Sequence, residues 1–260
     1  PMLIQYLISV KARQNTSRSL TNVLSEMTFP NDSLAEMGQY LLLLRQNRNP
    51  KALQTVLETE RRMSSATLKQ TYNKVKDQFP GFSLENYEVQ REKARDELKT
   101  MSGEKRQKAE AQLAQLDAVM GDLAKGLEFW EGEGKQILTI YTKPYKEYKD
   151  VDLKAKMEGY GRFVTMAMPN YKMAMIRCLY AQVEEDLASL AIAARLYEAE
   201  NGRLPGGPQD VSKWNGIIDP FTGEPYLYQT SGSELVFYSV GPDLVDEKAR
   251  STYDPAANGT

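Results

Sequence analysis

Helical periodicity runs almost without a break from residue 3 to about residue 200, and this feature most limits what the chain can fold into. The stretch is rich in Ala, Leu, Glu, Lys and Gln, which are good helix formers, and it contains few prolines. Strand-like segments bounded by glycine and proline occur only after Pro205. The sequence therefore predicts an α+β protein, in which a mostly α-helical body precedes a small antiparallel β-sheet.

A charged segment near residues 84–128 predicts a long helical hairpin. Its apolar residues recur at alternating spacings of four and three, which is typical of a coiled-coil seam, but the pattern covers fewer than three heptads. Ser102-Gly103 interrupts the helix that begins near Leu84, so we expect an antiparallel hairpin that projects from the body rather than a long coiled-coil dimer. The residues of the seam are Ala109, Leu113, Leu116, Met120, Leu123 and Leu127.

A second long helix is expected to begin after Asn170. We therefore divide the chain into a helical body, residues 1–168, and a C-terminal domain, residues 169–260. Asn201-Gly202 supplies a residue that can adopt the left-handed conformation at the end of this helix. The helix and the segments after it together predict the second domain.

Two strands are expected after this helix, at residues 226–230 and 235–240. A two-stranded ribbon is only marginally stable alone, so one of its faces must be buried. We expect Leu227, Leu235 and Phe237, or their alternate neighbours, to pack on the helix. The predicted contact stripe of the helix consists of Ile176, Tyr180, Val183, Leu187, Leu190, Ala194 and Tyr197.

The composition excludes several classes of function. The chain has no histidine, which removes the commonest general base and the commonest zinc ligand. Its one cysteine, Cys178, lies in an apolar helical stretch and is expected to pack in the core rather than act as a nucleophile. A net charge of −2 provides no field that would attract nucleic acid. We therefore expect a protein that is not an enzyme and does not bind nucleic acid.

The sequence contains no candidate membrane span, because no segment reaches the roughly 18 to 20 apolar residues that a transmembrane helix needs. The chain begins with Pro1 instead of a start methionine. We expect a signal peptide or membrane anchor to precede it in the native protein.

Three motifs near the C-terminus carry a family resemblance. Asn201-Gly-Arg-Leu-Pro205 ends the long helix, Asp219-Pro-Phe-Thr-Gly-Glu-Pro-Tyr226 forms a turn, and Tyr238-Ser-Val-Gly-Pro-Asp243 follows the second strand. In this order they resemble the globular head of the major pseudopilins of type II secretion systems. The chain as a whole is similar to uncharacterised envelope proteins of planctomycete-type bacteria, which carry such a head after a long helical region.

The resemblance implies a non-enzymatic protein of the bacterial periplasm or cell envelope that acts through contacts with protein partners. The chain departs from the family in one respect. In a pseudopilin, a membrane-spanning start forms the first half of the same helix, whereas residues 1–170 precede the helix here. The head is therefore expected to be a structural module, because a fold does not bring its function with it.

The resemblance also implies a calcium site in the loop after the second strand, where Asp243 matches the family motif best. Asp254 matches it less closely, and Asp246 and Glu247 are included because Ca²⁺ prefers six to eight oxygen ligands. Two basic residues of the same loop, Lys248 and Arg250, support the alternative of a solvated acidic loop without metal. The predicted ligands are Asp243, Asp246, Glu247 and Asp254.

Two other functions stay open. One is an extracytoplasmic hydrolase that uses a pair of carboxylates, although adjacent helical residues face different directions and no nucleophile can be identified near the loop carboxylates. The other is a cytosolic helical adaptor whose C-terminal ribbon resembles a pseudopilin by chance. The candidate carboxylate pairs are Glu184 with Glu185, and Asp243 with Asp246.

Overall fold

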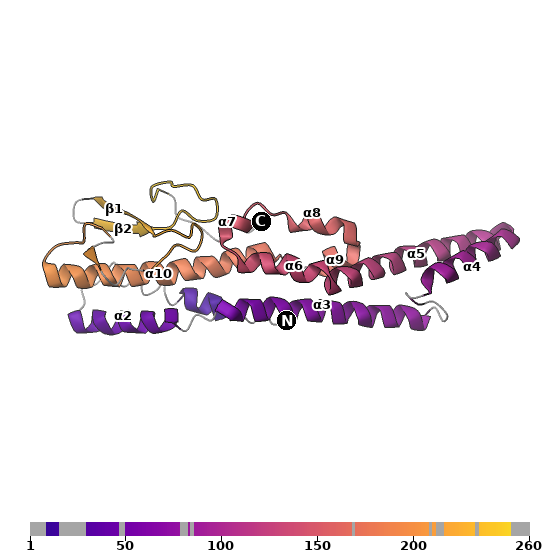
Figure 1. Ribbon diagram of the computed structural model, residues 1–260, viewed down its shortest axis with the longest axis horizontal. Helices are drawn as coiled ribbons and strands as arrows, with labels where there is room; N and C mark the ends of the chain where they lie inside the picture. The colour runs from indigo at the N-terminus through magenta and orange to yellow at the C-terminus, as the bar shows by residue number, and fades with distance from the viewer. Residues whose placement is uncertain are drawn as a thin grey trace. The chain divides into compact units, whose positions relative to one another are not determined.

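The described chain is mostly helical and ends in a two-stranded antiparallel sheet (Figure 1), so the predicted α+β class is confirmed. The structure is a computed structural model. It describes residues 9–15, 30–46, 50–78, 83, 86–167, 170–207, 210–211, 216–231 and 234–250. Within these ranges, no helix combines the length and the apolar character of a membrane span.

The chain forms two compact units. Unit 1 comprises Pro1–Leu53, Tyr141–Asp150 and Asn170–Thr260, and unit 2 comprises Gln54–Ile140 and Val151–Pro169. One junction lies next to the boundary expected after residue 168. The first 53 residues, however, which were expected to belong to the helical body, group with the C-terminal residues because α2 packs on α10.

Helix α10 (Tyr171–Asn201) is the longest helix of unit 1, and local signals set both of its ends. The side chain of Asn170 caps the first turn, where its Oδ1 accepts a hydrogen bond from the amide of Met173 at 3.1 Å. Gly202 ends the helix in the left-handed conformation, with φ of 69°, as predicted.

Helix α2 (Asn31–Gln46) lies along α10 and forms an apolar core with it (Figure 1). The two helices approach closely at Gly38, where an added Cβ would lie 3.3 Å from Cγ2 of Ile192. A side chain at position 38 would therefore require the Ile192 side chain to shift by a few tenths of an ångström. The buried core consists of Leu34, Leu41, Ala188 and Ile192, with Met37 and Leu196 packed against it.

The sheet of unit 1 consists of β1 (Leu227–Ser231) and β2 (Glu234–Tyr238), and β2 contacts α10. The register pairs Leu227 with Tyr238 and Tyr228 with Phe237. Because side chains alternate between faces, Phe237 and Leu235 share a face with Tyr228 and not with Leu227. Leu227 is 37% exposed, so its predicted burial is wrong, whereas Leu235 and Phe237 are half-buried as expected.

The predicted helical hairpin is present in unit 2 as α4 (Tyr87–Thr100) and α5 (Gly103–Glu131). Gly103 has φ of 62°, which allows the chain to reverse at the predicted interruption. The hydroxyl of Tyr87 and the guanidinium of Arg91 both donate to the carboxylate of Asp117, which links the two helices. Residues 101–108 at the tip are exposed, whereas Leu116, Met120 and Leu123 of the predicted seam are buried.

The remaining elements of unit 2 surround the C-terminal half of α5. At Gly126, an added Cβ would lie 3.1 Å from Leu68 of α3 and 3.5 Å from Val164 of α9, so these three helices meet there. The described elements of this unit are α3 (Pro50–Gln78, from Gln54 on), α6 (Glu133–Thr139), α8 (Leu153–Met157), η2 (Glu158–Tyr160) and α9 (Arg162–Ala167), and unit 1 also contains α7 (Tyr145–Tyr148).

Arg61 of α3 caps the C-terminal end of α5. Its Nη1 donates to the carbonyl oxygen of Trp130 at 2.7 Å, one of the carbonyls that a helix end leaves without a partner within the helix. Its Nη2 lies 2.8 Å from Oε1 of Glu58. The hydrogen bond from Arg61 lowers the pKa of Glu58 to about 2. The ion pair with Glu58 therefore holds the guanidinium of Arg61 against the C-terminal end of α5.

We predict that Arg61→Gln lowers the free energy of unfolding by about 1–3 kcal/mol, because a charged hydrogen bond to a half-buried helix end is lost. Arg62→Gln is the matched control, since Arg62 also pairs with Glu58, at 3.2 Å, but its side chain is 73% exposed. Urea unfolding followed by tryptophan fluorescence measures both variants. Because the pKa of Glu58 is lowered, the contribution of the pair is lost as the pH falls from 4.5 toward 2. Equal effects of the two substitutions would contradict the capping role.

Candidate functional site

The Asp219-Pro-Phe-Thr-Gly motif forms a turn that is held by its own first residue. Oδ1 of Asp219 accepts from the amide of Phe221 at 2.9 Å, and the Asp219 carbonyl accepts from the amide of Gly223 at 2.8 Å. Gly223 has φ of 76°, a conformation that favours glycine. Aspartate side chains commonly stabilise turns in this way, so the residue types of the motif are explained by backbone geometry.

The same carboxylate connects the turn to the segment after β2. Oδ2 of Asp219 accepts from the hydroxyl of Ser239 at 2.7 Å, and that hydroxyl oxygen accepts from the amide of Gly241 at 3.0 Å. Asp219 is only 2% exposed. Burial raises the pKa of its carboxyl above the ordinary value of 3.8, and the hydrogen bonds from Phe221 and Ser239 oppose this shift. Asp219 thus joins two of the three motifs that carry the family resemblance.

Phe221 anchors the turn in a cluster of aromatic side chains. Its fully buried ring lies 5.1 Å from the ring of Tyr145 in α7 and 5.2 Å from the ring of Tyr180 in α10, both edge to face. The hydroxyl of Tyr145 donates to the carbonyl of Pro242 at 2.9 Å. The turn and the segment after β2 are therefore both fastened to the helices of unit 1.

A second buried carboxylate fastens the start of the ribbon to α10. Asp186 is 1% exposed, and its Oδ2 accepts from the hydroxyl of Tyr226 at 3.2 Å. Tyr226 ends the second motif and immediately precedes β1. Asp219, Phe221 and Tyr226 thus form the turn and pack it against the helices of unit 1.

Three of the four predicted calcium ligands lie in the exposed segment after β2. Oδ1 of Asp243 accepts from the amide of Val245 at 3.0 Å, and Oδ1 of Asp246 accepts from the amide of Lys248 at 2.8 Å. Glu247 is exposed, and Asp254 lies outside the described residues. Among the residues that the structure describes, no three acidic, histidine or cysteine side chains gather around one point as a metal site would require. Calcium binding stays a prediction.

The other carboxylate pair considered from the sequence contacts one segment of unit 1. Oε1 of Glu184 accepts from Nε2 of Gln14 at 2.9 Å, and Oε1 of Glu185 lies 3.5 Å from Nε of Arg13. Glu185 is 3% exposed. Both side chains therefore meet helical residues 9–15, and their contacts are those of a structural interface.

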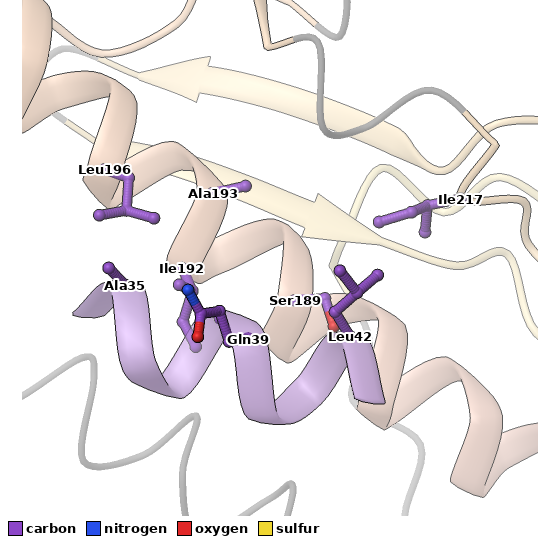
Figure 2. A pocket seen from close by; sticks show the side chains of 9 residues that line it. Ala35, Gln39, Leu42, Ser189, Ile192, Ala193, Leu196 and Ile217 are labelled. Atoms are coloured by element: carbon purple, nitrogen blue, oxygen red, sulfur yellow. The ribbon is translucent and has the colours of Figure 1, made fainter. Parts of the chain in front are cut away.

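An apolar groove with a volume of about 420 Å³ lies between α2 and α10, with Ile217 contributed by the segment before β1 (Figure 2). Small residues of both helices form part of its lining, and Leu42 and Leu196 project into it from either helix. The described lining carries no charged side chain. It consists of Ala35, Gly38, Gln39, Leu42, Ser189, Ile192, Ala193, Leu196 and Ile217.

Helix α2 also carries exposed apolar side chains, of which Leu42 lines the groove. Tyr40 is 53% exposed, Leu42 is 50% exposed and Leu43 is 55% exposed, whereas Leu41 is buried. We call Tyr40, Leu42 and Leu43 the α2 patch. The run of four leucines from position 41 is the signal in the sequence, because a helix cannot turn consecutive residues toward one core.

Comparison with known proteins adds no family assignment. No protein-family model matches the chain, no curated protein matches it, and no solved structure matches it. The resemblance to the pseudopilin head therefore stays a prediction.

We predict that Asp219→Asn changes how stability depends on pH. Because the pKa of Asp219 is raised in the folded state, the folded protein binds this proton more readily than the unfolded chain does. The free energy of unfolding of the native protein should therefore rise, relative to that of the variant, as the pH is lowered from 7 toward 4. Urea unfolding at several pH values measures the difference.

Ser239→Ala is the companion variant, since it removes one donor to the same carboxylate. It should cost about 1–3 kcal/mol at neutral pH and less in acid, because the lost hydrogen bond favours the charged form. A pH-independent difference for Asp219→Asn would show that Asp219 does not titrate in this way.

Proposed function

We propose that this chain is a non-enzymatic interaction protein of the bacterial periplasm or cell envelope, which presents a pseudopilin-like head and binds a protein partner through unit 1. The observation that carries the proposal is the apolar groove, together with the exposed apolar side chains of α2. Contiguous apolar surface on a protein exterior is typical of a binding site. Asp219, Phe221 and Tyr226 of the motifs, by contrast, are buried and engaged in packing.

The distribution of polar groups supports a binding function over catalysis. The buried carboxylates of Asp186 and Asp219 accept hydrogen bonds from Tyr226 and Ser239 respectively, within the packed interior of unit 1. The lining of the groove offers an amide at Gln39 and a hydroxyl at Ser189, together with aliphatic side chains. Such a lining excludes water and accommodates aliphatic groups of a partner, but it supplies no general acid or base.

The experiment is site-specific photo-crosslinking in cells of the organism that encodes the chain. A photoreactive amino acid at Tyr40 or Leu43 should give protein adducts in the envelope fraction. The same amino acid at Val89 of α4, which is 65% exposed but lies in the other unit, is the control and should give none. Adducts at all three positions, or at none, would contradict a partner site on the α2 patch.

We further predict that Leu42→Asp reduces the yield of these adducts at least about tenfold, because a charge buried against an apolar partner remains unpaired. Leu42 is 50% exposed, so the substitution should leave the melting temperature of the protein nearly unchanged. Circular dichroism during heating checks this point. Adducts recovered mainly from the cytosol would support the helical adaptor instead of the envelope protein.

Calcium binding by the loop after β2 is the second part of the proposal. It is supported by the carboxylates of Asp243, Asp246 and Glu247, which lie close together in sequence and are exposed. After treatment with EDTA, added Ca²⁺ should raise the melting temperature, and a concentration of 100 times the dissociation constant corresponds to about 2.7 kcal/mol. Equal concentrations of Mg²⁺ should have a smaller effect.

Asp243→Ala should abolish the calcium effect. The matched control is Asp150→Ala, which removes an aspartate whose side chain is 87% exposed and which lies outside the loop. A melting temperature that does not respond to Ca²⁺ would leave the solvated acidic loop as the correct interpretation.

A further inference from the structure

Residues 9–15 form a short helical segment at the N-terminal end of unit 1, and we call this segment the N-terminal strap. Val10 is 3% exposed and Gln14 is 7% exposed. These two residues are four positions apart, so they lie on the same face of the helical segment. The strap is therefore seated on the protein by one apolar and one polar side chain.

Two polar contacts join the strap to α10. Gln14 donates to Glu184 at 2.9 Å, and Arg13 lies 3.5 Å from Glu185. The side chain of Lys11 donates to Oε1 of Gln14 at 3.2 Å and so braces it from the strap itself. The strap thus places positive and amide groups on two adjacent carboxylates in the middle of α10.

The contact between α2 and α10, by contrast, is apolar. Its buried members are aliphatic, with Leu41 at 3% exposure and Ile192 at 1%. Separating such a contact exposes apolar surface at a cost of about 25 cal/mol per Å², and no new interaction with water compensates for it. This interface should separate only when unit 1 unfolds.

When the strap separates from α10, the loss of an ion pair is offset by the hydration of a carboxylate. The ion pair between Arg13 and Glu185 would be lost, but the Glu185 carboxylate, which is 3% exposed, would regain its hydration. The desolvation penalty of a buried charge is of the same order as the attraction that pairing provides. Among the described residues, opening the strap also exposes one buried apolar side chain, Val10, whereas opening the contact between α2 and α10 exposes a cluster of four. Opening the strap therefore costs less.

We infer that the N-terminal strap is a releasable segment that opens from α10 while the remainder of unit 1 stays folded, and that its opening uncovers Glu184 and Glu185. Local openings of this kind occur at free energies well below that of global unfolding. The strap is a conformational device of unit 1, and it is independent of the proposed function.

The test uses two equally buried positions, Val10 in the strap and Leu41 in α2, each 3% exposed. Val10→Cys and Leu41→Cys are prepared separately in the full chain with Cys178→Ala, which removes the native thiol. The rate of thiol labelling by a maleimide is measured under native conditions. The thiol of Val10→Cys should react at least about tenfold faster, since about 1.4 kcal/mol separates rates by this factor.

A charge variant tests the cause of the opening. Arg13→Gln should accelerate labelling of Val10→Cys severalfold and leave Leu41→Cys unchanged, because Glu185 then favours the open, hydrated state. The matched control is Arg195→Gln, which removes a half-exposed cation from α10 of the same unit and should alter neither rate. Equal labelling rates at the two positions, or acceleration of both by Arg13→Gln, would overturn the inference.

Discussion

Unit 1 depends on the burial of α10 on more than one of its sides. On one side, Ile192 packs against α2, and on another, Tyr180 contacts the ring of Phe221 in the turn before the sheet. A two-stranded sheet is only marginally stable alone, so β1 and β2 rely on this helix and on the turn that Asp219 holds. The packing of α2 on α10 is also the reason that residues 1–53 group with the C-terminal residues in unit 1 and not with residues 54–140 in unit 2.

Buried polar groups decide where the ribbon is attached. Asp219 connects the turn to Ser239, and Asp186 of α10 accepts a hydrogen bond from Tyr226. Each hydrogen bond satisfies a group that would otherwise be costly to bury, and each requires a defined position of the partner. These attachments account for Asp219, Tyr226 and Ser239, three of the residues that carry the resemblance to the pseudopilin head. Within the part of the chain that the structure describes, the exposed apolar side chains of α2 make no such attachment, and for this reason they carry the proposed function.

Much of the fold could be predicted because its signals are local. Asn170 and Gly202 set the ends of α10, and Gly103 marks the reversal of the helical hairpin, as expected from residue type alone. Which face of the two-stranded ribbon is buried could not be predicted, because a shift of one residue in the register moves every side chain to the other face. The register places Leu227 on the exposed face, opposite to the expectation. Of the candidate sites, the acidic loop was predicted from the family resemblance and from its carboxylates in sequence, whereas the groove depends on the pairing of α2 with α10.

The sequence by itself determined the helices, their ends, the hairpin and the existence of two strands, because these depend on propensities and turn residues within a few positions of one another. Only the tertiary structure decided the partners of these elements. Gln14 meets Glu184, Arg61 meets the carbonyl of Trp130, and α2 meets α10 across long stretches of chain. Such pairings are stabilised by the free energy of burying the surfaces of two elements against each other. This free energy is gained only when distant elements pack together, so it cannot be deduced from any one local segment.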